Sequence, residues 1–263
     1  MKSLFIVLFC VFVVFAQRIV SLAPSATNQL VALGVDSLLV GKTSFCSGKN
    51  TKIIGDVINI SGESIMALNP DIVLAGGLTG KSLVEKLRKS NVNVFVMPDP
   101  RNYMELSQNF RNIAEIIGVS QKADSILSLV DAEYSRIKNE TIQFTPNIFI
   151  QLSVNPIYTI MNNTLGNEII TAAGAINAFD LDRGAVVSRE SVVAANPDII
   201  IIADMENLSK KEVDKWNKFK NISAVRNNAV YVFDGYEIGS ATPLSFIETV
   251  KKVRGILYAL HFM

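Results

Sequence analysis

The residues of this chain that could do covalent or metal chemistry are few and far apart. The 263 residues include two cysteines, Cys10 and Cys46, and one histidine, His261. A Ser-His-Asp triad would need His261 as its base, and neither Cys46 nor His261 has a second metal ligand at a typical spacing. Neither a Gly-x-Gly-x-x-Gly motif nor a complete Gly-x-x-x-x-Gly-Lys-Ser/Thr motif is present. We therefore expect a protein that is not an enzyme and that carries no cofactor and no metal ion of its own.

Glu63 and Glu190 occupy the same place in two copies of one segment. Ser61–Leu74 and Ser188–Ile201 are offset by 127 residues and are identical at eight of fourteen positions. Each copy predicts a short helix that begins at a Ser N-cap and ends at Asn-Pro-Asp, followed by a buried parallel strand. A carboxylate in the first turn is stabilised by the helix dipole. Two copies this far apart predict two similar lobes.

The rest of the chain alternates strands and helices around one long helical segment. Arg18–Ala23 and Leu38–Gly41 have strand patterns before it, and Asn147–Leu152 has one after it. Gln121–Lys138 has apolar residues at helical spacing without Gly or Pro. We expect an α/β fold with two doubly wound parallel-sheet lobes, joined by a single long rigid helix, with the ligand cleft between the lobes. The expected boundaries are a signal peptide at 1–16, an N-terminal lobe at 17–118, the linking helix at 119–142 and a C-terminal lobe at 143–263.

The first sixteen residues have the pattern of a secretory signal peptide. Lys2 precedes an apolar run from Leu4 to Phe15, and Ala16 is the small residue at the expected cleavage site. Cys10 follows a bulky residue inside the run, so we expect an exported protein that is not a lipoprotein; a retained anchor is the alternative. Removing Lys2 leaves 24 basic and 24 acidic residues. This balance predicts no nucleic-acid partner.

The loops after the predicted strands should hold the ligand, because open α/β sheets bind ligands outside the carboxyl ends of their strands. Aromatic side chains in these loops suit a large, flat, partly apolar ligand such as a corrin or a porphyrin. Two arginines are available if the ligand is anionic. The candidate ligand-binding residues are Pro24, Ser25, Phe45, Cys46, Gly76, Gly77, Leu78, Arg101 and Tyr103 from the first lobe, and Tyr158, Arg183, Tyr236, Glu237 and Ser240 from the second.

The opening RIVSLAPSATNQLVALG, the paired ES…NPDIV/I segments and the linking helix together resemble periplasmic solute-binding proteins of ABC importers for cobalamin, ferric siderophores or haem. The resemblance covers the chain after the signal segment. It implies limited closure of the two lobes around a ligand and delivery to a permease dimer with a cytoplasmic ATPase. It also implies that Glu63 and Glu190 dock to arginines on the two permease subunits, one from each lobe.

The sequence departs from this family's patterns in two ways that bear on the ligand. The cobalamin binders use tryptophans in the pocket, whereas Trp216 here lies in a Lys-rich helix. Many siderophore and haem binders have a basic residue where Leu244 follows Pro243. We expect a protein that captures a metal chelate, with a corrinoid such as cobalamin favoured. The alternatives are a ferric-siderophore or haem binder of the same family, a non-transport adhesin or sensor, and a chelatase-like enzyme.

Overall fold

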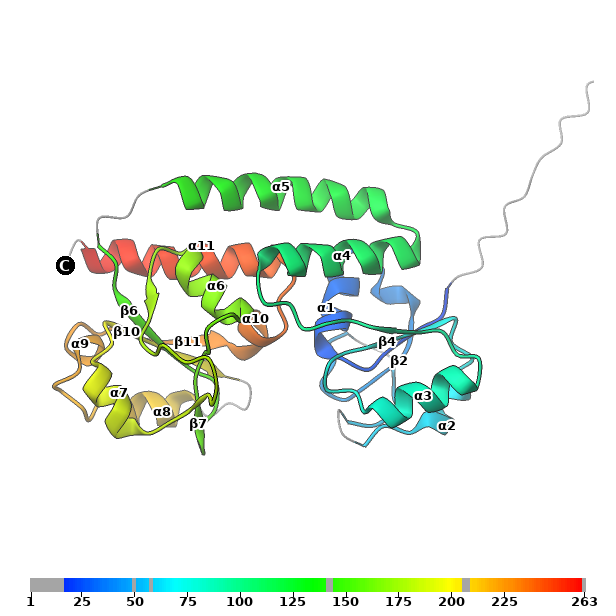
Figure 1. Cartoon of the computed structure of the whole chain (residues 1–263), viewed down its shortest axis with the longest axis horizontal. Coiled ribbons are helices and arrows are strands. Elements are labelled where there is room, and N and C mark those ends of the chain that lie inside the picture. The colour runs from blue at the N-terminus through cyan, green and yellow to red at the C-terminus, as the bar shows by residue number, and fades with distance from the viewer. Residues whose placement is uncertain (1–16, 49–50, 57–58, 141–143, 205–208, 262–263) are drawn as a thin grey trace, which may run out of the picture.

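Two α/β lobes lie side by side on the same side of a layer of long helices (Figure 1). The computed structural model describes residues 17–48, 51–56, 59–140, 144–204 and 209–261, so the predicted signal segment lies outside the described residues. The helical layer contains α4 (Tyr103–Ile117), α5 (Ser120–Asn139) and α11 (Pro243–His261). Among the described residues, no helix has both the length and the apolar character needed to span a membrane.

The N-terminal lobe is built on a five-stranded parallel sheet in the order β3-β2-β1-β4-β5. Its central strands are apolar and buried on both faces, as expected for strands covered by helices on each side. The order reverses between β1 and β4, which makes this the switch point of a doubly wound sheet. The elements are β1 (Ile19–Ser21), α1 (Pro24–Ala32), η1 (Asp36–Leu38), β2 (Leu39–Lys42), β3 (Lys52–Ile53), α2 (Gly62–Met66), β4 (Ile72–Ala75), α3 (Lys81–Lys89) and β5 (Val94–Val96).

The C-terminal lobe has a four-stranded parallel sheet in the order β11-β10-β6-β8. A separate two-stranded antiparallel ribbon pairs β7 with β9. The elements are β6 (Asn147–Gln151), β7 (Ile157–Tyr158), α6 (Leu165–Ala172), β8 (Ile176–Asn177), β9 (Val186–Val187), α7 (Arg189–Ala195), β10 (Ile199–Asp204), α8 (Ser209–Trp216), α9 (Ser223–Arg226), β11 (Val230–Asp234) and α10 (Gly235–Gly239). The predicted architecture of two parallel-sheet lobes and one linking helix is confirmed.

The repeated segment has the same local structure in both lobes. The Ser61 hydroxyl accepts the N–H three residues on at 3.1 Å, and the Ser188 hydroxyl does the same at 3.1 Å. Asn69 and Asn196 adopt left-handed backbone conformations, with φ of 44° and 46°. Asn adopts the left-handed conformation more readily than most residues, which suits the end of a helix. The proline that follows prevents the helix from continuing. The two copies therefore present their first-turn glutamates in matching positions.

The repeat also ties each lobe's first strand to its sheet. A carboxylate oxygen of Asp71 accepts the N–H of Arg18 at 2.6 Å, just before β1. In the second lobe, Asp198 accepts the N–H of Asn147 at 2.9 Å, at the start of β6. These aspartates lie at the amino ends of the strands, where the sequence places them. They are structural anchors at the edge of the sheet opposite the cleft.

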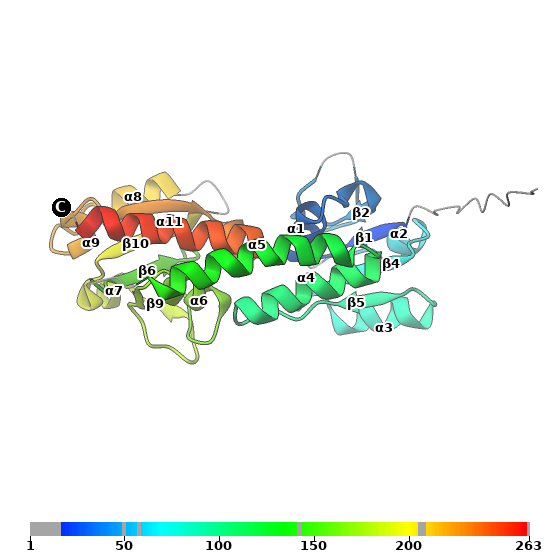
Figure 2. The ribbon, with the colours of Figure 1, turned by 90° about the horizontal axis from the view of Figure 1, so that it is seen from above.

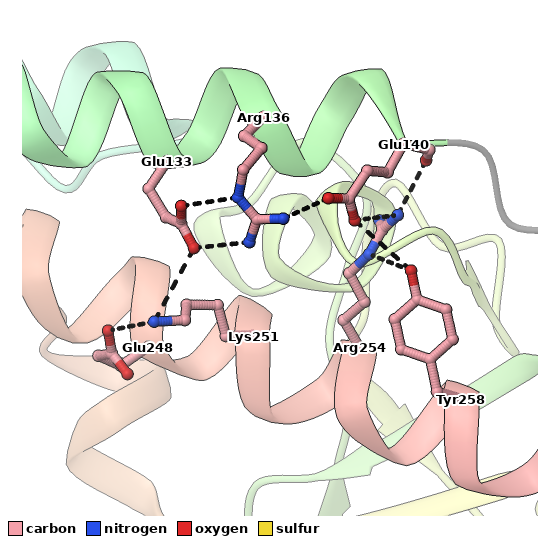
Figure 3. Close-up of polar contacts among 7 residues, drawn as sticks. All are labelled: Glu133, Arg136, Glu140, Glu248, Lys251, Arg254 and Tyr258. Atoms are coloured by element: carbon pink, nitrogen blue, oxygen red, sulfur yellow. Dashed lines mark hydrogen bonds and ion pairs between the residues drawn. The ribbon is translucent and has the colours of Figure 1, made fainter.

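Helix α5 runs along the molecule from the first lobe to the second (Figure 2). It packs against α4 in the first lobe and against α11 in the second. Arg136 of α5 forms ion pairs with Glu133 and with Glu140. Arg254 of α11 donates to the carbonyl oxygen of Glu140 at 2.8 Å, and Lys251 lies 3.9 Å from Glu133 (Figure 3). This network fixes the end of the linking helix on the second lobe.

Three aromatic rings from different elements meet where the lobes join. Tyr103 of α4 lies with its ring centroid 4.5 Å from that of Tyr134 in α5 and 5.2 Å from that of Phe246 in α11. The Tyr103 hydroxyl donates to Asp131 at 2.5 Å, and the Tyr134 hydroxyl donates to Glu168 of α6. Burial, together with the neighbouring Asp131 carboxylate, raises the pKa of Tyr103. The cluster packs both lobes onto the linking helix.

Candidate ligand-binding cleft

Two cavities lie between the lobes, and Phe45 and Tyr236 line both of them. The larger, about 450 Å³, is also lined by Asn28, Val31, Ala32, Cys46, Ser47, Asp234, Glu237, Thr242 and Ser245. The smaller, about 280 Å³, is also lined by Leu22, Ala23, Pro24, Ser25, Gly76, Gly77, Leu78, Thr79, Asp99, Gly239 and Ser240. Each cavity thus takes residues from both lobes. Together they form the candidate ligand-binding cleft.

The smaller cavity opens at the switch point of the N-terminal sheet. Pro24 follows β1, and Gly76 and Gly77 follow β4, so the carboxyl ends of neighbouring strands form one wall. A Cβ atom at Gly77 would lie 2.4 Å from the carboxylate of Asp99. Asp99 therefore lies directly against this loop, and a larger residue at position 77 would force the Asp99 side chain to move. Pro24 is the first residue of α1 rather than part of a turn, since its fixed φ suits a first helical position.

The second lobe contributes α10 and the beginning of α11. Sequence patterns predict a loop around Tyr236 and Glu237, but both lie in the short helix α10. The Asp234 side chain caps this helix by accepting the N–H of Tyr236 at 2.9 Å. The cap turns the chain directly after β11. It is the local reason that Tyr236 and Glu237 lie in the cleft.

Hydrogen bonds cross directly between the lobes beside the larger cavity. The side-chain amide of Asn28 in α1 donates to the carbonyl oxygen of Ser240 at 2.9 Å, and that of Gln29 donates to Ala241 at 3.2 Å. Ser47 donates to the amide oxygen of Asn28 at 2.9 Å, which fixes the orientation of the amide. The cleft geometry therefore depends on α1 as well as on the linking helix.

The charged residues that line the two cavities are acidic. Asp99 lines the smaller cavity, and Asp234 and Glu237 line the larger one. Within the part of the chain that the structure describes, neither lining includes Lys, Arg or His. Lys252 lies 3.2 Å from Glu237 and compensates part of this charge from outside the lining. The cleft is suited to a neutral or cationic ligand surface.

Most of the candidate residues from the sequence come together in the cleft. Those that line it are Pro24, Ser25, Phe45, Cys46, Gly76, Gly77, Leu78, Tyr236, Glu237 and Ser240. Cys46 is largely buried, and its thiol lies 3.1 Å from the hydroxyl of Thr43. Among the described residues, no group of three or more His, Cys, Asp or Glu side chains is arranged to hold a metal ion.

The other four candidates do not line either cavity. Tyr103 is not at a loop tip: it is the first residue of α4 and is buried in the aromatic junction. Arg101 lies 2.5 Å from the carboxylate of Glu105, four residues along the chain. Tyr158, in β7, and Arg183, between β8 and β9, are exposed away from the two linings. These four residues were chosen because they follow predicted strands in the sequence, but this position does not determine which way their side chains point.

Several cleft residues have no distinctive signal in the sequence. They are Asn28, Ser47, Asp234, Thr242 and Ser245. Asp99, which also lines the cleft, does have a signal, because it lies between two prolines in a loop that follows a predicted strand. Asn28 is within a helix whose amphipathic pattern indicates only packing. Its role depends on a hydrogen bond to Ser240, which is 212 residues away in the chain. A contact over this distance leaves no local pattern in the sequence.

The paired glutamates are exposed at matching places on the two lobes. Glu63 lies in the first turn of α2 and Glu190 in the first turn of α7. Both helices lie on the side of the lobes away from α5 (Figure 1). A hydrogen bond from Lys86 lowers the pKa of Glu63, whereas the backbone N–H of Glu190 itself is the main cause of its lowered pKa.

Comparison with known proteins gives relatives that match most of the chain. The chain is 28% identical over 255 residues to an ABC transporter substrate-binding lipoprotein, YvrC, of Bacillus subtilis, covering 92% of this chain and 80% of the relative. It is 25% identical over 201 residues to a vitamin B12-binding protein of Yersinia pestis, covering 73% and 71%. The solved heme-binding protein RhuT of Roseiflexus sp. RS-1 has the same fold, with a TM-score of 0.81, 24% identity and coverage of 93% and 98%.

The Bacillus relative corrects one expectation from the sequence. It is named as a lipoprotein, which contradicts the expectation of an exported chain that is not a lipoprotein. The expectation relied on the bulky residue before Cys10, and this local feature is not a sufficient criterion. The residues concerned lie outside those that the structure describes.

The family profile described as periplasmic binding protein matches residues 19–237. The match contains β1, the linking helix α5, both copies of the repeat and the cleft residues up to Glu237. These proteins bind solutes for transport and do not catalyse reactions, in agreement with the expectation that the chain is not an enzyme. The chain belongs to the periplasmic binding protein family.

Proposed function

We propose that this protein is the substrate-binding component of an ABC importer and that it captures a corrinoid in the cleft between its lobes. The protein then presents the ligand to a permease dimer that works with a cytoplasmic ATPase. The likeness to an ABC transporter substrate-binding protein and to a vitamin B12-binding protein supports this assignment. The limited inter-lobe motion that the linking helix allows suits capture and release rather than catalysis.

The charge of the cleft is the observation that carries the choice of ligand. A corrinoid presents uncharged amide side chains around its ring, whereas haem carries carboxylates and a ferric catecholate siderophore is anionic. Carboxylates at Asp99, Asp234 and Glu237 would repel an anionic chelate, and the cavity linings within the described residues offer it no cation. The carboxylates can accept hydrogen bonds from the amide groups of the ligand. The side chains of Asn28 and Ser245 can both donate hydrogen bonds to these groups and accept hydrogen bonds from them.

Phe45 and Tyr236 supply the apolar contacts in this proposal. They come from different lobes and line both cavities, so a flat ring seated between the lobes would contact both side chains. Phe45 is 54% exposed in the absence of ligand and gains burial when the cleft is filled.

The exposed glutamates are proposed to mark the permease-docking face. Glu63 and Glu190 lie one on each lobe, on the side away from the linking helix. Two similar permease subunits would meet two similar acidic points, and opposite charge on the permease would favour fast and oriented association.

Calorimetric titration of the purified protein with cyanocobalamin, haemin and a ferric catecholate tests the ligand. The expected result is micromolar or tighter binding of cyanocobalamin, and weak or no binding of the two anionic chelates. Tight binding of haemin or the ferric catecholate without cyanocobalamin would replace the corrinoid with that ligand. No binding to any of the three would contradict the transport assignment and favour an adhesin or sensor.

A further inference from the structure

The two proposed docking glutamates have different electrostatic surroundings. The ammonium of Lys86, in α3, lies 2.5 Å from a carboxylate oxygen of Glu63. Both side chains are on the surface, 54% and 72% exposed. The pair is therefore accessible to water and to a partner, and a cation on the partner would compete with Lys86 for the Glu63 carboxylate.

Glu190 has no ion-pair partner among the described residues, although two cations belong to the same region. Arg189 precedes it in the chain, and Lys215 lies on the neighbouring helix α8. Both instead bind Glu212: Arg189 pairs with one carboxylate oxygen, and Lys215 lies 2.5 Å from the other. The Glu212 side chain is 1% exposed, and the charged ends of both side chains are held at this glutamate rather than at Glu190.

The second lobe holds its nearby cations in a different way. Arg189 stands where the first copy of the repeat has Gly62, and it pairs with Glu212. The guanidinium of Arg189 lies 4.6 Å from the ring centroid of Trp216, which holds it over the buried tryptophan. Arg189 and Lys215 are therefore held at Glu212, whereas Lys86 pairs with Glu63 itself.

We propose that Lys86 masks Glu63 and competes with the permease cation that binds there, while Glu190 is unmasked and provides the stronger docking contact. This inference rests on the proposed docking role of the two glutamates. The partner groups are arginine or lysine side chains, one on each permease subunit. Glu190 makes the first contact, and Glu63 engages after its internal ion pair has opened.

The test measures affinity for the cognate permease–ATPase complex, reconstituted in lipid nanodiscs at low ionic strength. Lys86→Met is expected to raise the affinity about two- to fivefold, the range for an exposed ion pair. Lys89→Met is the matched control: it removes the same charge from the same helix at an exposed position without an ion pair to Glu63. It is expected to leave the affinity unchanged.

A double-mutant comparison separates masking from a general effect of charge. In a Glu63→Gln background, Lys86→Met should no longer raise the affinity, and Glu190→Gln should weaken binding more than Glu63→Gln does. An equal gain from Lys86→Met with and without Glu63 would overturn the masking role. So would a loss from Glu63→Gln as large as the loss from Glu190→Gln.

The same measurements distinguish failure of this inference from failure of the docking proposal. If neither Glu63→Gln nor Glu190→Gln alters affinity, the two glutamates do not dock the permease and both proposals are wrong. If both substitutions weaken binding but Lys86→Met has no effect, docking stands and masking is wrong. Ligand affinity should be the same in all variants, because these residues lie outside the cleft linings.

Discussion

The side-chain amide of Asn28 donates a hydrogen bond of 2.9 Å to the carbonyl oxygen of Ser240, joining the two lobes beside the larger cavity. Asn28→Asp should weaken ligand binding about tenfold, because a carboxylate cannot donate to this carbonyl and repels it. Asn28→Ala should act in the same direction without adding a charge. Asn112→Asp, on α4 where the amide is bonded to Gln108, is the control and should bind ligand normally. Calorimetry measures the affinities, and unchanged binding by both Asn28 variants would contradict a role for this contact.

Phe45→Ala should weaken ligand binding about thirtyfold with little change in stability. Loss of a ring buried by ligand is worth about 2 kcal/mol, but the side chain is 54% exposed in the free protein and contributes little to the fold. Phe144→Ala is the matched control, since Phe144 is 39% exposed and lines a separate cavity near Asp198. Titration and thermal unfolding of both variants check the prediction. Equal loss of affinity in the two would argue against a cleft contact.

Arg254 should matter more for stability than its neighbour Lys251 on α11. The Arg254 side chain is 6% exposed and donates to the Glu140 carbonyl oxygen, whereas Lys251 is 42% exposed (Figure 3). Arg254→Met should lower the free energy of unfolding by about 1–3 kcal/mol, because it removes the hydrogen bond and the ion pair that a largely buried arginine makes with the part-buried Glu140. Lys251→Met should lower it by less than about 1 kcal/mol. Urea unfolding of the two variants measures both values; the reverse order would contradict the anchoring role.

Stability should fall at acid pH partly through Glu212. Desolvation acts to raise the pKa of this glutamate, but hydrogen bonds from Lys215, Arg189 and Gln151 outweigh it and the pKa is lowered. A carboxylate with a lowered folded-state pKa stabilises the fold above its ordinary pKa of about 4.5, and this contribution is lost as the pH falls through the folded-state value. Glu212→Gln should therefore be less stable near pH 7 and show a shallower decline below pH 5 in urea unfolding. An equal loss of stability with falling pH in the original protein and in Glu212→Gln would contradict this role of Glu212.

The Lys86–Glu63 pair should be visible without any permease. Lys86 lowers the pKa of Glu63, so Lys86→Met should raise that pKa toward its ordinary value and leave the pKa of Glu190 unchanged. NMR titration of the side-chain carboxyl carbons measures both groups in one sample. Lys89→Met should change neither pKa. A Glu63 pKa that does not respond to Lys86→Met would mean that the ion pair does not form in solution.

The sequence predicts the architecture well because its signals are local. The Ser N-caps and the Asn-Pro-Asp segments end helices and begin strands through backbone conformations that neighbouring residues impose. The uninterrupted apolar spacing of α5 needs no information from the rest of the chain. The two copies of the repeat then indicate two lobes of the same type. Positions such as Pro24 and Gly77 were also predictable, since residues that follow β1 and β4 necessarily lie at the carboxyl edge of the sheet.

The sequence did not predict where the side chains of some candidate ligand-binding residues point. Tyr103 follows a strand and a polar loop, as a ligand-binding tyrosine would, but it packs on Tyr134 and Phe246 at the lobe junction. Arg101 was expected to be available for an anionic ligand, but Glu105 in the first turn of α4 forms an ion pair with it. Neither outcome is visible in a local pattern, because it depends on which surface another element covers.

By itself, the sequence determined the two lobes, the helix that links them and the strand ends that form the cleft, because periodicity, helix caps and prolines act over a few residues. Only the tertiary structure decided which side chains line the cleft, that its charged lining residues are acidic, and that Lys86 covers Glu63 while Glu190 is free of an ion pair among the described residues. The reason is distance along the chain. Asn28 and Ser240 are 212 residues apart, and Glu63 and Lys86 are 23 apart. Such contacts form only when packing of the whole fold brings the two groups together.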